Sequence, residues 1–170
     1  MRVRRAVPDD ARAIAEGFAR VVEEGVLGTE PPVDVDARAE RFGRQIEQEA
    51  PAAVWVLESD GMIIGHAGVQ ETHARGVLSM FVAIVAEGRG RGGGRALVQA
   101  VLEHAESSGA HKVELEVWPD NATAIALYES AGFQVEGLRR DHYRRRDGSL
   151  RSSLLMGCLI TSPDAHRSRD

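Results

Sequence analysis

Residues 88–95 form a run of glycine and arginine whose composition suits a phosphate group. In order, the run reads Gly88, Arg89, Gly90, Arg91, Gly92, Gly93, Gly94 and Arg95. An apolar stripe with helical spacing follows, so the run lies where a helix begins. A helix start offers unpartnered backbone N–H groups and the positive end of the peptide dipoles; glycines let oxygens approach, and arginines add charge. The run therefore predicts a pyrophosphate site.

Composition alone leaves other functions open for this run. A flexible surface turn is also rich in glycine and arginine. Gly88-x-Gly90-x-x-Gly93, with Glu114 further on, matches the fingerprint of nicotinamide dinucleotide sites. That fingerprint belongs to a parallel βαβ unit, whereas three antiparallel strands are predicted before this run, which argues against an oxidoreductase. A nucleoside-triphosphate P-loop is excluded because the sequence has no Gly-Lys-Ser or Gly-Lys-Thr.

The elements that position this run follow from hydrophobic spacing and turn residues. Strands are predicted at residues 2–6, 53–57, 62–70, 77–85, 113–117, 133–138 and 150–160. Helices are predicted at residues 11–22, 35–46, 96–105 and 122–131. Tight turns are expected at Asp60-Gly61 and Asp147-Gly148, and a loop at Glu24–Asp34. This order predicts an α+β (mixed α/β) fold.

Length and composition limit the class of protein. At 170 residues, one domain is expected at residues 1–160, followed by a polar tail at 161–170. The net charge of −5 argues against general nucleic-acid binding, and no apolar run suits a membrane span. One cysteine, Cys158, and scattered histidines give no metal-ligand spacing, so no metal is expected. The N-terminus lacks the apolar segment of a secretory signal, so a cytoplasmic location is expected.

Two segments together resemble the GNAT (N-acetyltransferase) superfamily. Arg89-x-x-Gly92-x-Gly94 is similar to the family's Arg/Gln-x-x-Gly-x-Gly/Ala loop for the coenzyme A pyrophosphate. Residues 121–133 read Asn-Ala-Thr-Ala-Ile-Ala-Leu-Tyr-Glu-Ser-Ala-Gly-Phe and are similar to its Asn-x-x-Ala-x-x-Leu-Tyr-x-x-x-Gly-Phe helix. The clear resemblance runs from about residue 77 to 138. The chain departs from the family at Ala86 and Gly88, where proline and an aromatic residue are common.

The resemblance implies a splayed, mostly antiparallel sheet of about seven strands flanked by four helices, with acetyl-CoA as co-substrate. The pantetheine arm is expected between the strands at 77–85 and 113–117, held by backbone groups of Val82 and Ile84. Asn121 and Tyr128 match family positions near the arm and the sulfur. A homodimer is also common in the family. The residues expected at the pyrophosphate are Arg89, Gly90, Arg91, Gly92, Gly93, Gly94 and Arg95.

Glu116 and Tyr128 are the candidate catalytic residues. An amine must be neutral to attack a thioester, but an amine of pKa ~10.4 is mostly charged at pH 7, so a base or a water chain is useful. Glu116 matches the catalytic glutamate of GNAT N-terminal protein acetyltransferases whose strand also reads Leu-Glu-Val; alternatively, Glu114 and Glu116 mark a solvated strand face. Tyr128 matches a general acid that protonates the departing thiolate; alternatively, it is a core aromatic residue.

The acceptor is expected to enter between the loop at 24–34 and the segment at 141–150. The acidic side chains of this loop could attract a cationic amine, or they could form a solvated rim. Arg144-Arg145-Arg146 could recognise an acidic group, or it could be an ordinary surface charge run. The predicted function is transfer of an acetyl group from acetyl-CoA to a primary amine of a small molecule or amino acid. A peptide N-terminus is the alternative acceptor, and a non-catalytic coenzyme A-binding module is a more distant alternative.

Overall fold

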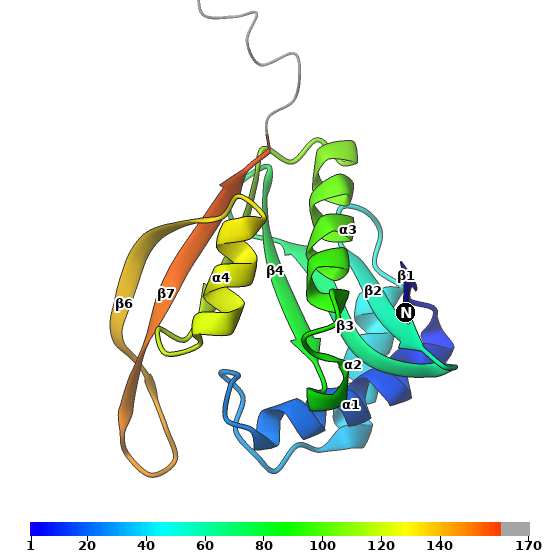
Figure 1. Ribbon diagram of the computed structural model, residues 1–170, viewed down its shortest axis with the longest axis horizontal. Helices are drawn as coiled ribbons and strands as arrows, with labels where there is room; N and C mark the ends of the chain where they lie inside the picture. Colours follow the sequence, from blue (N-terminus) through cyan, green and yellow to red (C-terminus); the bar gives the residue numbers. More distant parts are fainter. Residues whose placement is uncertain (161–170) are drawn as a thin grey trace, which may run out of the picture.

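A computed structural model describes residues 1–160, and the predicted tail at 161–170 lies outside the described residues. The described chain forms one seven-stranded sheet with the spatial order β1-β2-β3-β4-β5-β7-β6 (Figure 1). The strands are β1 (Arg2–Arg5), β2 (Ala53–Ser59), β3 (Met62–Glu71), β4 (Val77–Ile84), β5 (Lys112–Val117), β6 (Gln134–Arg144) and β7 (Leu150–Leu159). The helices are α1 (Ala11–Glu23), α2 (Val35–Ile46), α3 (Gly93–Ser107) and α4 (Ala122–Ser130), with 3-10 turns at η1 (Pro8–Asp10) and η2 (Ala86–Gly88). The predicted fold class and element order are confirmed.

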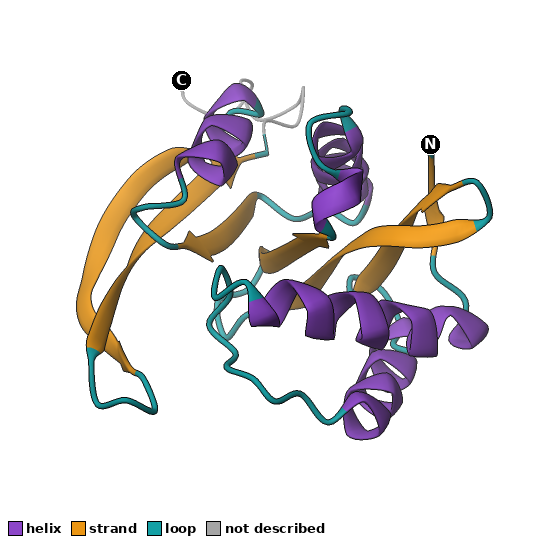
Figure 2. Ribbon diagram, turned by 60° about the horizontal axis from the view of Figure 1, so that its bottom comes forward, coloured by secondary structure: helices purple, strands orange, loops and turns teal. Residues whose placement is uncertain are grey.

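Helices cover both faces of the sheet (Figure 2). On one face, α1 and α2 pack against Val54 and Val56 of β2. On the opposite face, α3 brings Leu97 and Val101 into a larger apolar cluster. Because β2 is covered on both sides, its first five residues, 53–57, are apolar without polar alternation.

The parallel strands β4 and β5 pair over a short length and then separate. Their register joins Val77 to Lys112 and ends at Ser79 and Glu114. Beyond that point β4 stays paired with β3, and β5 stays paired with β7. The facing edges of the two strands are therefore open toward Ile84. This is the predicted splay, and a sheet with β4 and β5 as its single parallel pair within residues 1–160 excludes the dinucleotide-binding alternative.

The closing hairpin is longer than predicted. The strand expected at 133–138 continues as β6 to Arg144, so residues 139–144 are strand and not part of a polar connection. The register is irregular between Arg139 and Tyr143, and Asp141 has a φ of 50°. An exposed edge strand has no face that must be apolar. Hydrophobic spacing therefore could not predict the polar second half of β6 as strand. No helix among residues 1–160 has the length and apolarity of a membrane-spanning segment.

Candidate active site

Residues 89–95, here called the Gly/Arg loop, lead directly into α3. Gly90 and Gly92 have φ values of 70° and 85°, which favour glycine, and a Cβ at either would meet nothing within 4 Å. The N–H of Arg89 donates to the carbonyl of Ala86 at 3.3 Å, and the next N–H with a partner is that of Ala96, which donates to the carbonyl of Gly92 at 3.1 Å. No acceptor within residues 1–160 takes a hydrogen bond from the N–H groups of residues 90–95. Unpartnered N–H groups at a helix start can bind an anion, and a pyrophosphate at this loop stays a prediction.

Two further glycines let α3 begin close to its neighbours. A Cβ at Gly93 would collide with Leu57 of β2, and one at Gly94 would lie 2.9 Å from Cδ2 of Leu127 in α4. At the end of α4, Ser130 Oγ lies 3.2 Å from Nη2 of Arg95. The Gly/Arg loop and the helix that carried the second part of the resemblance are therefore in contact.

The arginines of the Gly/Arg loop differ in their partners. Arg89 donates from Nε to the carbonyl of Ile84 at 2.8 Å. Its other two nitrogens donate to both carboxylate oxygens of Glu24, at 2.5 and 2.9 Å. Arg89 thereby ties the loop to β4 and to the end of α1, whereas Arg91 is exposed. The predicted pantetheine contacts, Val82 and Ile84, lie on the part of β4 that has separated from β5.

The helix α4 and its N-cap carry the two predicted site residues of the second motif, Asn121 and Tyr128. Asn121 caps the helix, since its Oδ1 accepts a hydrogen bond from the N–H of Ala124 at 3.2 Å. Tyr128 is 8% exposed and packs with its ring centroid 5.8 Å from that of Phe133. Burial raises the pKa of Tyr128 to about 12, so the phenol keeps its proton at neutral pH. Its hydroxyl has no partner within residues 1–160 and is not among the fully enclosed polar atoms, so solvent reaches it.

Glu116 is held by three side chains of the β6–β7 hairpin. Arg139 Nη1 donates to Oε1 at 2.7 Å. The hydroxyls of Tyr143 and Ser153 both donate to Oε2, each at 2.8 Å. Glu116 follows Glu114, the residue at which β4–β5 pairing ends, so its carboxylate lies on the open part of β5. Its contacts go beyond those of a solvated strand face.

Trp118, immediately after β5, is a site residue that the sequence reasoning missed. It is 4% exposed and packs edge-on to Tyr143, with centroids 5.1 Å apart. The guanidinium of Arg151 lies 4.5 Å from the centre of its ring. The indole Nε1 is enclosed and has no hydrogen-bond partner among residues 1–160. The signals that could have found this cluster were a tryptophan next to Glu116 and the polar Ser153 in an apolar strand.

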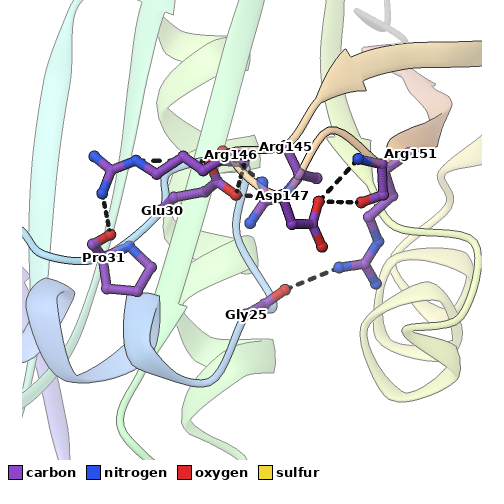
Figure 3. A network of polar contacts seen from close by, with 9 residues as sticks. Gly25, Glu30, Pro31, Arg145, Arg146, Asp147 and Arg151 are labelled. Carbon is purple, nitrogen blue, oxygen red and sulfur yellow. Dashed lines mark hydrogen bonds and ion pairs between the residues drawn. The ribbon is translucent and has the colours of Figure 1, made fainter.

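Side chains from distant parts of the sequence join the loop at 25–31 to the hairpin segment at 145–151 (Figure 3). We call this assembly the loop–hairpin clasp. Glu30 Oε1 lies 3.0 Å from Nε of Arg145, and Glu30 Oε2 accepts from the backbone N–H of Arg146 at 3.1 Å. Arg146 Nη1 also donates to the carbonyl of Pro31 at 2.6 Å. Glu30 and Arg145 are largely covered, with side-chain exposures of 21% and 13%.

Arg151 forms the second connection of the clasp. It donates to the carbonyl of Gly25 at 3.1 Å and binds both carboxylate oxygens of Asp120 at 2.8 and 2.7 Å. The acids expected to attract a cationic amine are mostly used internally, because Glu24 binds Arg89 and Asp34 caps α2. The two segments predicted to frame the acceptor entrance are in contact, and two of the three consecutive arginines serve that contact.

Within residues 1–160, no group of three His, Cys, Asp or Glu side chains is arranged to hold a metal ion. The geometry combines a helix start with unpartnered N–H groups, an opened strand pair, a phenol and a carboxylate.

Several known proteins with similar sequences or folds are acetyltransferases. Residues 21–133 match the Acetyltransferase (GNAT) family. The chain is 38% identical over 96 residues to the N-alpha-acetyltransferase RimI of Mycobacterium tuberculosis, which covers 51% of this chain and 54% of that protein. It is 30% identical over 141 residues to the L-methionine sulfoximine/L-methionine sulfone acetyltransferase of Pseudomonas aeruginosa, covering 78% of this chain and 81% of that protein.

The fold is also similar to that of a phosphinothricin acetyltransferase from Sinorhizobium meliloti, whose crystal structure contains acetyl-CoA. The TM-score is 0.81 at 23% identity, covering 97% of this chain and 94% of the other. The chain spans about half the length of the relatives that it matches at 38% to 40% identity. The family match covers more than half of the chain and includes strands β2 to β5 and the motifs at residues 89–94 and 121–133. The chain belongs to the acetyltransferase (GNAT) family.

Proposed function

We propose that this protein is an N-acetyltransferase that moves the acetyl group of acetyl-CoA to a primary amine of a small molecule or amino acid. The observation that carries this proposal is the row of unpartnered N–H groups at residues 90–95, beside the opening between β4 and β5. One domain at residues 1–160 supplies every residue that the proposal uses.

The described residues fit the pyrophosphate and the arm of coenzyme A. The N–H groups of the Gly/Arg loop would bind the pyrophosphate, with Arg91 and Arg95 adding positive charge. The open edge of β4 at Val82 and Ile84 would hold the amide groups of the arm. When bound, acetyl-CoA supplies an activated acyl group with a thiolate as leaving group. Arg89 can contribute charge only by sharing or exchanging its contact with Glu24.

Glu116 and Tyr128 divide the proton transfers of direct attack. Glu116 takes a proton from the acceptor nitrogen as that nitrogen forms its bond to the acetyl carbon. Tyr128 gives its proton to the sulfur as the carbon–sulfur bond breaks and sulfur keeps the electron pair. The products are an N-acetylated amine and free coenzyme A thiol, and solvent returns both side chains to their starting states. The raised pKa of Tyr128 supports this role because the phenol arrives protonated.

An amino acid or similar small amine is the preferred acceptor class. The Pseudomonas relative, whose name gives methionine sulfoximine and sulfone as substrates, matches over 78% of this chain. The RimI relative matches over a shorter part, 51% of this chain. A peptide N-terminus is the second candidate, because that shorter match has the higher identity of 38%.

The test measures release of free thiol from acetyl-CoA over a panel of amino acids, small amines and short peptides. We expect turnover with at least one small amine and weaker turnover with peptides. Preference for peptides would replace the acceptor class, and acetyl-CoA binding without transfer to any acceptor would support the non-catalytic alternative.

Tyr128→Phe tests the acid. The ring and its packing remain, so acetyl-CoA affinity should stay within about twofold, while kcat should fall by roughly 100-fold or more, the usual range for losing an acid–base group. Titration calorimetry with acetyl-CoA checks that the variant is folded and binds. Turnover equal to that of the unmodified enzyme would remove Tyr128 from the mechanism.

A further inference from the structure

We propose that Ser153 and Tyr143 are positioning residues that occupy Oε2 of Glu116, so that Oε1 is the oxygen that receives the acceptor's proton. This inference rests on the proposed role of Glu116 as base. It adds two residues from the β6–β7 hairpin and selects one atom of the carboxylate.

The hydrogen bonds of Glu116 are distributed unevenly over its two oxygens. Oε2 accepts from the hydroxyls of Ser153 and Tyr143, each at 2.8 Å. Oε1 accepts from Arg139 at 2.7 Å. A carboxylate oxygen has two lone-pair positions, so Oε2 is filled while Oε1 keeps one free. An acceptor N–H therefore finds an open position only at Oε1.

Ser153 is the most constrained member of this set. It is 1% exposed, whereas the two long side chains that share Glu116 reach it from the surface. It lies on β7 directly opposite Arg139 of β6. A buried hydroxyl left without a partner is unfavourable, so its hydrogen bond to Glu116 resists rearrangement. Ser153 thereby fixes the rotation of the carboxylate about its own axis.

Burial and the hydrogen bond to Glu116 raise the pKa of Tyr143 to about 12, so Tyr143 remains a donor throughout the physiological range. The other charged groups around Glu116 are Arg139 and, 3.4 Å from Arg139 Nη1, the ring of His142 on β6. On β7, Arg151 is engaged by Asp120, and on β5 the neighbouring acid is Glu114.

Ser153→Ala and Tyr143→Phe each remove one donor from Oε2 and keep most of the packing. The expected result is a move of the acidic limb of log kcat/KM to higher pH by about half a unit or more, with acetyl-CoA affinity unchanged. The side-chain carboxyl ¹³C resonance of Glu116, titrated in the enzyme without substrates, should move in the same direction. That resonance does not depend on knowing the acceptor.

The neighbouring Ser152→Ala is the matched control. Ser152 lies on the same strand, but its Oγ accepts from the N–H of Asp141 at 2.9 Å and does not touch Glu116. It should leave the acidic limb and the ¹³C midpoint in place. Ser153→Thr, which keeps the hydroxyl, should restore both toward their original values.

Two results separate the inference from the proposed function. If Glu116→Gln abolishes turnover but neither Ser153→Ala nor Tyr143→Phe moves the acidic limb or the ¹³C midpoint, the positioning role is wrong and the base survives. If Glu116→Gln keeps full turnover, the base assignment itself fails, and with it the selection of Oε1.

Discussion

The Gly/Arg loop and the loop–hairpin clasp are built by different means. The loop is one contiguous segment that offers backbone N–H groups, and its shape depends on glycines with positive φ such as Gly92. The clasp joins residues far apart in the chain: Arg145 and Gly28, for example, are separated by 117 positions. The clasp therefore depends on side-chain ion pairs and hydrogen bonds.

This difference explains why a short sequence motif can predict the Gly/Arg loop but not the clasp. A pyrophosphate can be bound by any helix start with open glycines, so a short motif can specify it. An acceptor pocket is enclosed by side chains whose partners come from other elements. Changes in the clasp should therefore alter acceptor use, and changes in the loop should alter acetyl-CoA use.

Acidification tests the layer that α1 and α2 form on the sheet and has the largest expected effect on stability. His66 is 2% exposed among Phe18, Phe42 and Phe81, and burial lowers its pKa from 6.5 to about 4. The unfolded chain therefore takes up this proton at a higher pH than the folded chain does. Neutral His66 therefore contributes to the free energy of unfolding in full above pH ~6.5. As the pH falls toward 4, the free energy of unfolding decreases by roughly 3 kcal/mol.

Denaturant unfolding between pH 4 and 7 measures this loss. In His66→Leu, the same acidification should remove much less stability, whereas His73→Gln at an exposed loop position should behave like the unmodified protein. Since Phe18 and Phe42 belong to α1 and α2, hydrogen exchange should rise first in these helices. If stability depends on pH equally in all three proteins, protonation of His66 is not the cause of the loss.

Gly92→Ala and Gly148→Ala form a pair that separates the two regions. Both glycines have a φ of 85° and open space around a Cβ, so the backbone strain should be similar, about 1–2 kcal/mol each. Gly92→Ala should weaken acetyl-CoA binding by about tenfold, as measured by calorimetry. Gly148→Ala, between β6 and β7, should leave acetyl-CoA binding unchanged and raise the acceptor KM. If both variants change the constant of the same substrate, the loop and the clasp do not serve different substrates.

Glu30→Gln should give the smallest of these effects. It removes the charge that Arg145 and the Arg146 N–H share, while the side-chain oxygen can still accept a hydrogen bond. We expect a loss of about 1 kcal/mol, seen as a severalfold higher acceptor KM with an unchanged Kd for acetyl-CoA. Glu16→Gln in the exposed Arg12–Glu16 pair of α1 is the control and should change neither constant. An altered acetyl-CoA Kd in Glu30→Gln would mean that clasp and loop act as one unit.

Several parts of the fold and site were predictable because their causes are local. The Asp60-Gly61 turn was confirmed, with φ values of 52° and 75° at its two residues. The end of β6 was not predictable, since Arg139 and Tyr143 are polar and gain their partner only when Glu116 lies next to the hairpin. The charge of the loop at 24–34 suggested attraction of a cationic amine, but Glu24 and Glu30 form ion pairs with arginines from other elements.

The sequence by itself determined the order of elements, the α+β class, the glycine-rich helix start and the motif helix with Tyr128. Each of these depends on residues within a few positions of one another, because φ preferences, caps and hydrophobic spacing act over one or two turns. Tertiary structure alone decided that Arg89 binds Glu24 and that Ser153 lies under Glu116. It also decided that Glu30 closes the clasp. These contacts span distant parts of the chain, and only the packed sheet brings their partners within hydrogen-bonding distance.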